Sequence, residues 1–153
     1  KVYTTIDELR KELGCDRILI LRAHNGGGLP SPDNNLYSSI VYESSSKEVG
    51  NVKDTWQRQR IDKTYANLLL EVYKKGTAVI VTEDHPESIL KNVYTAQKVA
   101  TGFVFKISTK HNRFMYLSAH FATQVDSLSP EAQDYIRIAL NTLTDIFDNT
   151  KDI

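Results

Sequence analysis

The amino-acid sequence predicts a single domain of the α+β class, and three features of its patterning support this prediction. Helical periodicity occurs near both ends of the chain, over residues 5–13 and 129–147. Two alternating runs around a short polar turn, residues 103–108 and 114–121, predict a β-hairpin. The predicted order is helix, strand, strand, helix, strand, an irregular segment, the hairpin and a helix. A hairpin-rich sheet with helices on one face and at both ends is an α+β design, not a doubly wound parallel one.

The first two elements are a helix over residues 5–13 and a strand over residues 16–23. Thr5 and Glu8 have the spacing of a capping box, and Gly14 follows the helix as a natural stop signal. The strand contains the unbroken apolar run Ile-Leu-Ile-Leu. A short run of this kind indicates a strand that is buried on both faces, so we expect it to be central in its sheet.

The middle of the chain alternates between irregular and regular segments. Residues 24–36 hold three glycines and two prolines among asparagine and aspartate residues, a composition that is typical of a loop. A second strand is predicted over residues 38–43, and residues 44–54 are expected to be irregular. An apolar stripe predicts a helix over residues 61–75, with two lysines in its last turn where the helix dipole favours cations. Residues 77–82 follow as a short β-branched strand.

The second half contains one undecided segment and the clearest helix. Asp84 is predicted to cap a short helical turn that starts at Pro86. Residues 89–100 show no pattern that decides between helix and strand. The last helix is predicted to begin after Ser129 as its cap, with proline and glutamate in its first turn, and to continue an apolar stripe to Phe147.

Composition describes an ordinary globular protein and argues against several partners. The chain has 153 residues, enough to close one core, and 41% of them are hydrophobic. Nineteen basic residues balance nineteen acidic ones. Because nucleic-acid and anionic-membrane contacts usually leave a basic surplus, we expect neither as the main partner.

Cysteine content and the ends of the chain bear on location. The single cysteine, Cys15, cannot form an internal disulfide, and no apolar stretch is long enough to cross a membrane. No signal segment opens the sequence, so we expect a cytoplasmic protein. We expect residues 1–153 to form one domain, and a first residue of Lys1 in place of methionine is compatible with a piece of a longer polypeptide.

Four segments of the chain resemble elements of the GAF domain family. The segment GTAVIVTED (76–84) is similar to the glycine-led strand after the family's central helix, TGFVFKISTKHNRFMYLSAHFA (101–122) to its terminal hairpin, SLSPEAQDYIRIALNTLTDIF (127–147) to its closing helix, and CDRILILRAHNG (15–26) to its first strand. The resemblance implies a central antiparallel sheet of about five to six strands. The N- and C-terminal helices would pack on one face of this sheet, and a helix plus loops would cover the other.

The known subtypes of GAF domain do not match this chain closely. Bilin-binding members attach the chromophore to a cysteine after the central strands, whereas Cys15 opens the first strand. Methionine-sulfoxide reductases of this fold need one cysteine to attack the sulfoxide and others to resolve the oxidised intermediate, and this chain has a single cysteine. The Asn-Lys…Phe…Asp-Glu signature of cyclic-nucleotide binders is absent. Haem-binding members use a histidine, and four histidines leave that possibility open. The sequence therefore identifies no cofactor.

No constellation of residues predicts catalysis or a metal centre. The glycine run 26–28 lacks a following Gly-Lys-Ser/Thr, and Pro30 and Pro32 prevent a helix from starting directly after it. The histidines show neither a pair at i, i+4 spacing nor a Cys/His cluster. Glu83 and Asp84 would point in opposite directions on a strand, so they do not form an acid and base pair. We expect no enzyme.

Six residues are candidates for ligand contact: His24, Asn25, Tyr42, Trp56, Tyr65 and His120. His24 and Asn25 lie at the exit of the first strand. Trp56 lies in a polar stretch with little core to join, so we expect it to serve as a lid or a contact residue. For Tyr42 and Tyr65 the alternative to ligand contact is filling of the core. For His120 the alternative is a structural histidine held by a hydrogen bond.

Two functions are compatible with these features. In the first, the domain is a non-catalytic regulatory or sensory module that binds a small molecule between the sheet and the loops of residues 24–36 and 51–60. It would then form a homodimer through its first and last helices. In the second, it is a degenerate GAF-like module for interaction or assembly, such as a phage or mobile-element accessory protein. A pocket filled by the domain's own aromatic side chains would support the second.

Overall fold

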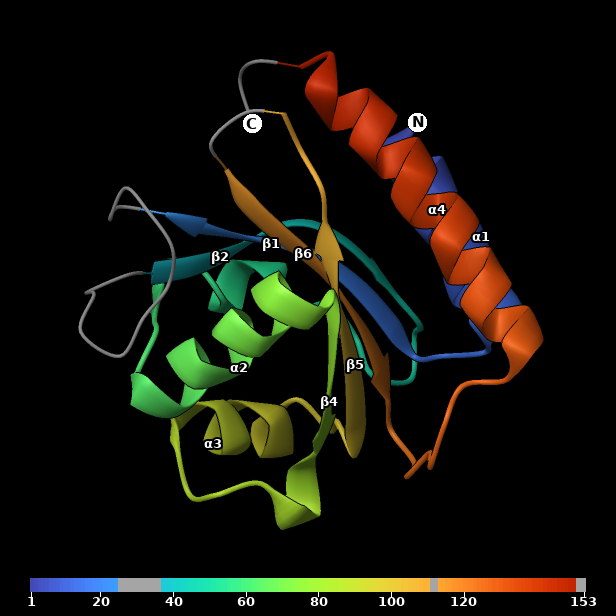
Figure 1. Ribbon diagram of the computed structural model, residues 1–153. Helices are drawn as coiled ribbons and strands as arrows, with labels where there is room; N and C mark the ends of the chain where they lie inside the picture. The colour runs from blue at the N-terminus through green and yellow to red at the C-terminus, as the bar shows by residue number, and fades with distance from the viewer. Residues whose placement is uncertain (25–36, 111–112, 151–153) are drawn as a thin grey trace.

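The computed structural model describes residues 1–24, 37–110 and 113–150 and confirms an α+β architecture (Figure 1). Its elements are α1 (Val2–Leu13), β1 (Arg17–His24), β2 (Tyr37–Ser45), η1 (Lys53–Thr55), β3 (Gln59–Arg60), α2 (Lys63–Lys75), β4 (Thr77–Val81), η2 (Thr82–Asp84), α3 (Ile89–Ala96), β5 (Thr101–Ile107), β6 (Phe114–Phe121) and α4 (Pro130–Asp148). The terminal helices α1 and α4 lie side by side on one face of the sheet. Helices α2 and α3 cover the other face. This is the layering expected from the sequence.

The sheet has six strands in the order β3-β2-β1-β6-β5-β4, and every pairing is antiparallel. Strand β1 lies between β2 and β6, which confirms its predicted central position. Its run Ile18–Leu21 is at most 1% exposed, since both faces of the strand are covered. The register between β1 and β2 shifts at Val41, where a β-bulge adds one residue to β2.

Each face of the sheet has its own core, because side chains alternate between faces along every strand. On the α2 and α3 face, Leu19, Leu21 and Tyr116 pack against helix residues such as Leu69 and Tyr94. The α1 and α4 face carries the second core, listed here by its largest members: Ile6, Leu9, Ile18, Ile20, Phe103, Leu117, Leu143 and Phe147. The fold is therefore a sheet between two helical layers.

Helix boundaries follow caps that the sequence only partly revealed. Helix α2 begins at Lys63, not at the predicted residue 61, because the Asp62 carboxylate accepts the Tyr65 N–H at 2.9 Å and caps the helix. The predicted cap at Asp84 is wrong: Asp84 ends the short 3-10 turn η2. Ser88 caps α3 instead and accepts the Lys91 N–H at 3.1 Å, so the undecided segment begins as a helix.

The segment after β2 is more ordered than the sequence predicted. Strand β2 continues to Ser45, and the 3-10 turn η1 follows within the stretch that was expected to be irregular. The Glu43 carboxylate accepts the N–H groups of Val52 and Lys53 at 2.7 and 2.8 Å. The Ile40 N–H also donates to the Trp56 carbonyl at 3.0 Å. These bonds fold the segment back against β2.

Within the described residues, no helix combines the length and the apolar character that crossing a membrane requires.

A glycine on β5 makes room for an aromatic ring of α3. Gly102 pairs with His120 across the sheet, and Tyr94 lies directly over it. A Cβ atom at position 102 would lie 3.0 Å from Tyr94 Cε2 and 3.2 Å from its hydroxyl oxygen. Gly102 therefore leaves the space that the Tyr94 ring of α3 occupies against the sheet.

We expect Gly102→Ala to destabilise the domain by about 1–3 kcal/mol, because the added methyl group overpacks a buried site. Urea unfolding followed by circular dichroism measures the change. In a Tyr94→Leu background the same substitution should cost less, since the ring it meets is gone. An equal cost in both backgrounds would show that Tyr94 is not the reason for the glycine.

Candidate functional site

The sequence predicted a ligand site between the sheet and the loops of residues 24–36 and 51–60, and of these the structure describes His24 and residues 51–60. The second loop borders the space between the sheet and helices α2 and α3. Large side chains of the chain itself occupy this space: Trp56, Tyr65, Tyr94, Tyr116 and His120, each at most 4% exposed. The Trp56 ring meets the rings of Tyr65 and Tyr94 with centroid separations of 6.2 and 6.4 Å. Tyr94 in turn packs edge-on against His120 at 4.9 Å. We call these five residues the aromatic cluster.

Three hydroxyl groups satisfy one another at the end of this cluster that lies over β2. The Ser38 hydroxyl lies 2.6 Å from the Tyr116 hydroxyl and 3.2 Å from that of Tyr65, and the two tyrosine hydroxyls also bond to each other. Three donors and three acceptors thus close a ring in a buried setting. Burial raises the pKa of both tyrosines above the ordinary value, so both hydroxyls stay protonated near neutral pH. The three hydroxyls form a buried hydrogen-bonded ring that joins β2, α2 and β6.

His120 is buried and neutral. Burial lowers its pKa to about 3, and the nearby Arg17 cation contributes in the same direction. Neither ring nitrogen of His120 has a hydrogen-bond partner among the described residues. The sequence also suggested that His120 is a structural histidine held by a hydrogen bond. His120 is buried as that interpretation expects, but the predicted hydrogen bond is not found among the described residues. Packing against Tyr94 and not polar contact holds the imidazole in place.

Arg17 is a buried cation at the other end of the cluster, and it ties three segments together. Its Nη1 donates to the Gln97 carbonyl at 3.2 Å, and its Nη2 donates to the carbonyls of Val49 and Gly50 at 3.2 and 3.1 Å. Glu43 supplies the countercharge, with Oε2 3.8 Å from Nε. Burial lowers the pKa of Arg17, and Glu43 opposes that shift. The guanidinium is thus committed to the fold.

A small pocket lies beside these Arg17 partners, between the loop after β2 and helix α3. Its volume is about 370 Å³, and its lining includes Val52, Thr55, Ala96, Gln97 and Lys98. Pockets of 300–1,000 Å³ are the usual size for small ligands, so this one lies at the lower limit.

The structure divides the predicted contact residues between the two faces of the sheet. Trp56, Tyr65 and His120 share the α2 and α3 face. Tyr42 lies on the opposite face, where its ring stacks on Phe147 at 6.0 Å. The bulge at Val41 is the reason: Ile40 and Tyr42 are two residues apart, yet they pair with the adjacent residues Leu21 and Ile20 and so face opposite sides.

His24 does not join the aromatic cluster. Alternation along β1 places His24 on the same face as Ile18 and Ile20, beyond the terminal helices. Its Nε2 hydrogen-bonds to the Ser39 hydroxyl at 2.7 Å. Asn25 lies outside the described residues, as does the glycine run 26–28.

The prediction that Trp56 is a lid residue is wrong, because its side chain is 2% exposed and belongs to the core. The local sequence is polar, but two contacts turn it inward: the Glu43 carboxylate accepts the Val52 N–H, and the Ile40 N–H donates to the Trp56 carbonyl. Sequence reasoning also missed Arg17, Tyr94 and Tyr116 as members of the site. Arg17 points to the same face of a buried strand as Leu19 and Leu21. This position in the sequence could have revealed Arg17 as a buried charge.

Conventional reactive groups are inert or scattered in the described structure. Burial raises the pKa of Cys15 to about 12, so its thiol is not a nucleophile near neutral pH. Among residues 1–24, 37–110 and 113–150, no three His, Cys, Asp or Glu side chains are grouped to hold a metal ion.

His120 should make stability depend on pH. Its pKa is about 3 in the folded chain and about 6.5 when unfolded, so between these values the unfolded chain binds more protons. The contribution of neutral His120 to the free energy of unfolding is fully present above about pH 6.5 and is lost as the pH falls toward 3. Between pH 8 and pH 5 we expect about 2 kcal/mol more loss in the wild type than in His120→Leu. Chemical denaturation at several pH values measures this difference in stability. Parallel pH profiles for the wild type and His120→Leu would contradict the low pKa of His120. His85→Leu serves as the control at a less buried histidine.

Glu43→Gln should strongly destabilise the domain, because it leaves the buried Arg17 cation without a countercharge. Removing one partner of a buried ion pair typically costs about 3–5 kcal/mol. The matched control is Asp54→Asn, which neutralises an exposed carboxylate in the same segment and should change stability by less than about 0.5 kcal/mol. Urea unfolding at neutral pH compares the two. Equal small effects would show that the carbonyl bonds of Arg17 suffice without Glu43.

Several solved structures are similar to this chain over nearly its whole length. The GAF domain of a two-component sensor histidine kinase from Bacillus halodurans is 17% identical with a TM-score of 0.69, and the match covers 97% of this chain and 91% of that one. GAF3 from Slr1393 of Synechocystis sp. PCC6803, in its photoproduct state, is 15% identical with a TM-score of 0.70, covering 96% and 90%. The red/green cyanobacteriochrome NpR6012g4, in its red light-absorbing state, is 19% identical with a TM-score of 0.67, covering 97% and 92%.

No protein-family model matches the chain, and no curated protein matches it. At these low identities the structural likeness speaks for the fold and not for the ligand. It agrees with the six-stranded antiparallel sheet between two helical layers and with the resemblance carried by the sequence segments. This chain therefore has the fold of GAF domains.

Proposed function

We propose that this chain is a non-catalytic regulatory domain of the GAF type that acts through contacts with other proteins. The observation that carries the proposal is the aromatic cluster, whose five side chains fill the space between the sheet and the α2 and α3 layer. A ligand in that space would have to displace buried rings, and each displaced ring would forfeit the free energy of its burial. A surface function avoids this cost.

The terminal helices are the surface that this proposal assigns to a second copy or a partner protein. Helices α1 and α4 lie side by side on one face of the sheet (Figure 1). Two large apolar side chains are exposed on them, Tyr3 on α1 at 50% and Ile138 on α4 at 56%. A partner that binds two arrangements of these helices unequally would shift their populations, and this is how a regulatory domain passes on a signal. The cytoplasm is the proposed location.

The second candidate is a sensory domain that binds a small molecule, and the 370 Å³ pocket beside α3 favours it. Two of the similar structures are GAF domains bound to phycoerythrobilin and phycocyanobilin. The indole N–H of Trp56 lacks a hydrogen-bond partner among the described residues and would be available to a ligand that rearranges the cluster. In this candidate function a ligand that displaces these rings would contact Trp56, Tyr65 and His120.

A thermal-shift screen separates the two functions, because a ligand that binds only the native state must raise the unfolding temperature. We expect no saturable shift from nucleotides, haem, bilins or amino acids. Ala96→Trp fills the pocket from an exposed position, and Thr95→Trp adds the same ring at a neighbouring position that does not line it. A shift that persists in Thr95→Trp and disappears in Ala96→Trp would overturn the protein-contact proposal in favour of the sensory one.

A further inference from the structure

Strand β4 ends the sheet, and half of its backbone groups point away from it. Lys106 donates to the Gly76 carbonyl at 2.9 Å, and Thr82 donates to the Ala100 carbonyl at 3.0 Å. Bonding alternates along an antiparallel pair, so residues 76, 78, 80 and 82 bond toward β5. Thr77, Val79 and Val81 therefore direct their N–H and C=O groups outward. No strand in the described part of the chain pairs with this edge.

This edge lacks the devices that normally prevent edge-to-edge pairing. Its sequence, Thr-Ala-Val-Ile-Val, contains no charge, proline or glycine, and its pairing with β5 has no bulge. Val79 at its centre is 50% exposed. The opposite edge is different, because β3 has only two residues and one of them is Arg60. Natural sheets protect edges by keeping them short and charged, so β4 is the edge that is suited to a partner.

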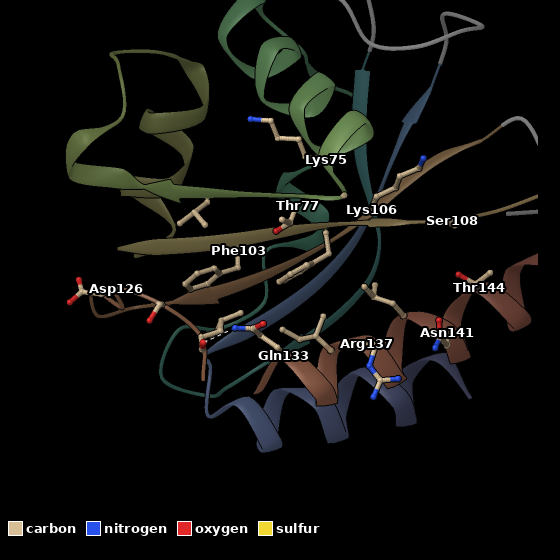
Figure 2. Close-up of a pocket in the computed structure, with 17 residues that line it drawn as sticks. Lys75, Thr77, Phe103, Lys106, Ser108, Asp126, Gln133, Arg137, Asn141 and Thr144 are labelled. Carbon is tan, nitrogen blue, oxygen red and sulfur yellow. Dashed lines mark hydrogen bonds between the residues drawn. The ribbon is translucent and has the colours of Figure 1, made fainter. Parts of the chain in front are cut away.

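An apolar groove of about 720 Å³ adjoins the same edge, between β4 and β5 on one side and α4 on the other (Figure 2). Phe103 points from β5 toward α4, and Val79 and Leu140 also line the groove. Four charged residues are also part of its lining: Lys75, Lys106, Asp126 and Arg137. Lys106 lies over the Tyr73 ring at 4.1 Å, and Arg137 pairs with Asp134 at 3.6 Å. The groove next to the edge is thus mostly apolar, and two of its cations already have partners within the chain.

We infer that β4 pairs antiparallel with β4 of a second copy of this chain, around a two-fold axis at Val79. In this register Val79 meets its own copy, and Thr77 meets Val81 at both ends. Every outward-facing residue therefore meets an outward-facing residue, and about six interchain hydrogen bonds form. The two six-stranded sheets become one continuous sheet, and the two apolar grooves approach each other beneath it.

Charge selects a second copy over an unrelated strand. A two-fold axis brings the central side chain next to itself, where a charge would repel its own copy, and Val79 carries none. Lys74 and Lys75 end helix α2 just before β4, and Glu83 and Asp84 lie in the turn η2 just after it; all four side chains are exposed. Antiparallel pairing therefore brings the basic end of one strand near the acidic end of the other. This complementarity is a property of the antiparallel arrangement.

This contact goes beyond the terminal-helix surface of the proposed function and does not depend on it. Pairing through β4 uses the sheet edge, while α1 and α4 remain accessible on their outer faces. A chain with both contacts would assemble beyond a dimer, because two self-complementary surfaces on one protomer link successive copies.

Disulfide cross-linking tests the register, because Cys15 is buried and an introduced surface cysteine is then the only accessible thiol. Val79→Cys should form a disulfide-linked dimer under mild oxidation, since paired residues lie about 5.5 Å apart. Thr77→Cys alone should not, because its two copies would be about 13 Å apart at 3.3 Å per residue. Val81→Cys alone should fail for the same reason. An equal mixture of Thr77→Cys and Val81→Cys should cross-link.

Sedimentation of the unmodified chain supplies the second measurement. We expect a concentration-dependent increase above the monomer mass of 17.4 kDa. Val79→Pro removes only an outward N–H and should weaken self-association at least tenfold while leaving the fold intact by circular dichroism. A chain that stays monomeric at its highest attainable concentration would overturn the inference, and so would equal cross-linking at all three positions.

The terminal-helix contact is monitored separately by Ile138→Cys. Cross-linking at Ile138→Cys without cross-linking at Val79→Cys would refute the β4 contact and leave the proposed function standing. The reverse outcome would support the β4 contact and remove the terminal-helix dimer.

Discussion

The buried guanidinium of Arg17 is the constraint around which the α2 and α3 face is organised. A buried cation is costly unless charge and hydrogen bonds compensate it, so the groups that compensate it must come to the strand. Three backbone carbonyls from the loop after β2 and from the end of α3 do so, and Glu43 adds the countercharge. Segments that are 32 to 80 residues away from Arg17 in sequence are thereby held at one point of β1.

The aromatic cluster follows from this anchoring. The loop after β2 is held on the sheet, and this brings Trp56 under α2. The end of α3 is held near Arg17, and this brings Tyr94 onto Gly102 and against His120. The interior of the domain is therefore closed by its own rings. A pocket of about 370 Å³ beside the end of α3 remains on this face, and the proposed contacts use the outer surfaces.

Those surfaces differ in character. The helical layer of α1 and α4 is mainly polar on its outside and exposes single large apolar side chains. The β4 edge combines outward backbone groups, an uncharged strand and an apolar groove in one continuous area. The first surface is suited to a weak and reversible contact between helices. The second is suited to strand addition, in which main-chain hydrogen bonds supply affinity and side chains supply register.

The sequence by itself determined the elements whose signals are local: α1, the central strand β1, the β5 and β6 hairpin and α4. Periodicity and alternation act over a few residues, so these elements could be predicted, although α1 begins at Val2 and not after a capping box at Thr5. The tertiary structure decided the rest. Trp56 is buried because the Glu43 carboxylate accepts N–H groups of the following loop and holds that segment against β2. Tyr42 leaves the site because one extra residue at Val41 reverses its face. Bonds from a side chain to a loop and the register of a strand have no periodic signature, so only the folded chain reveals them.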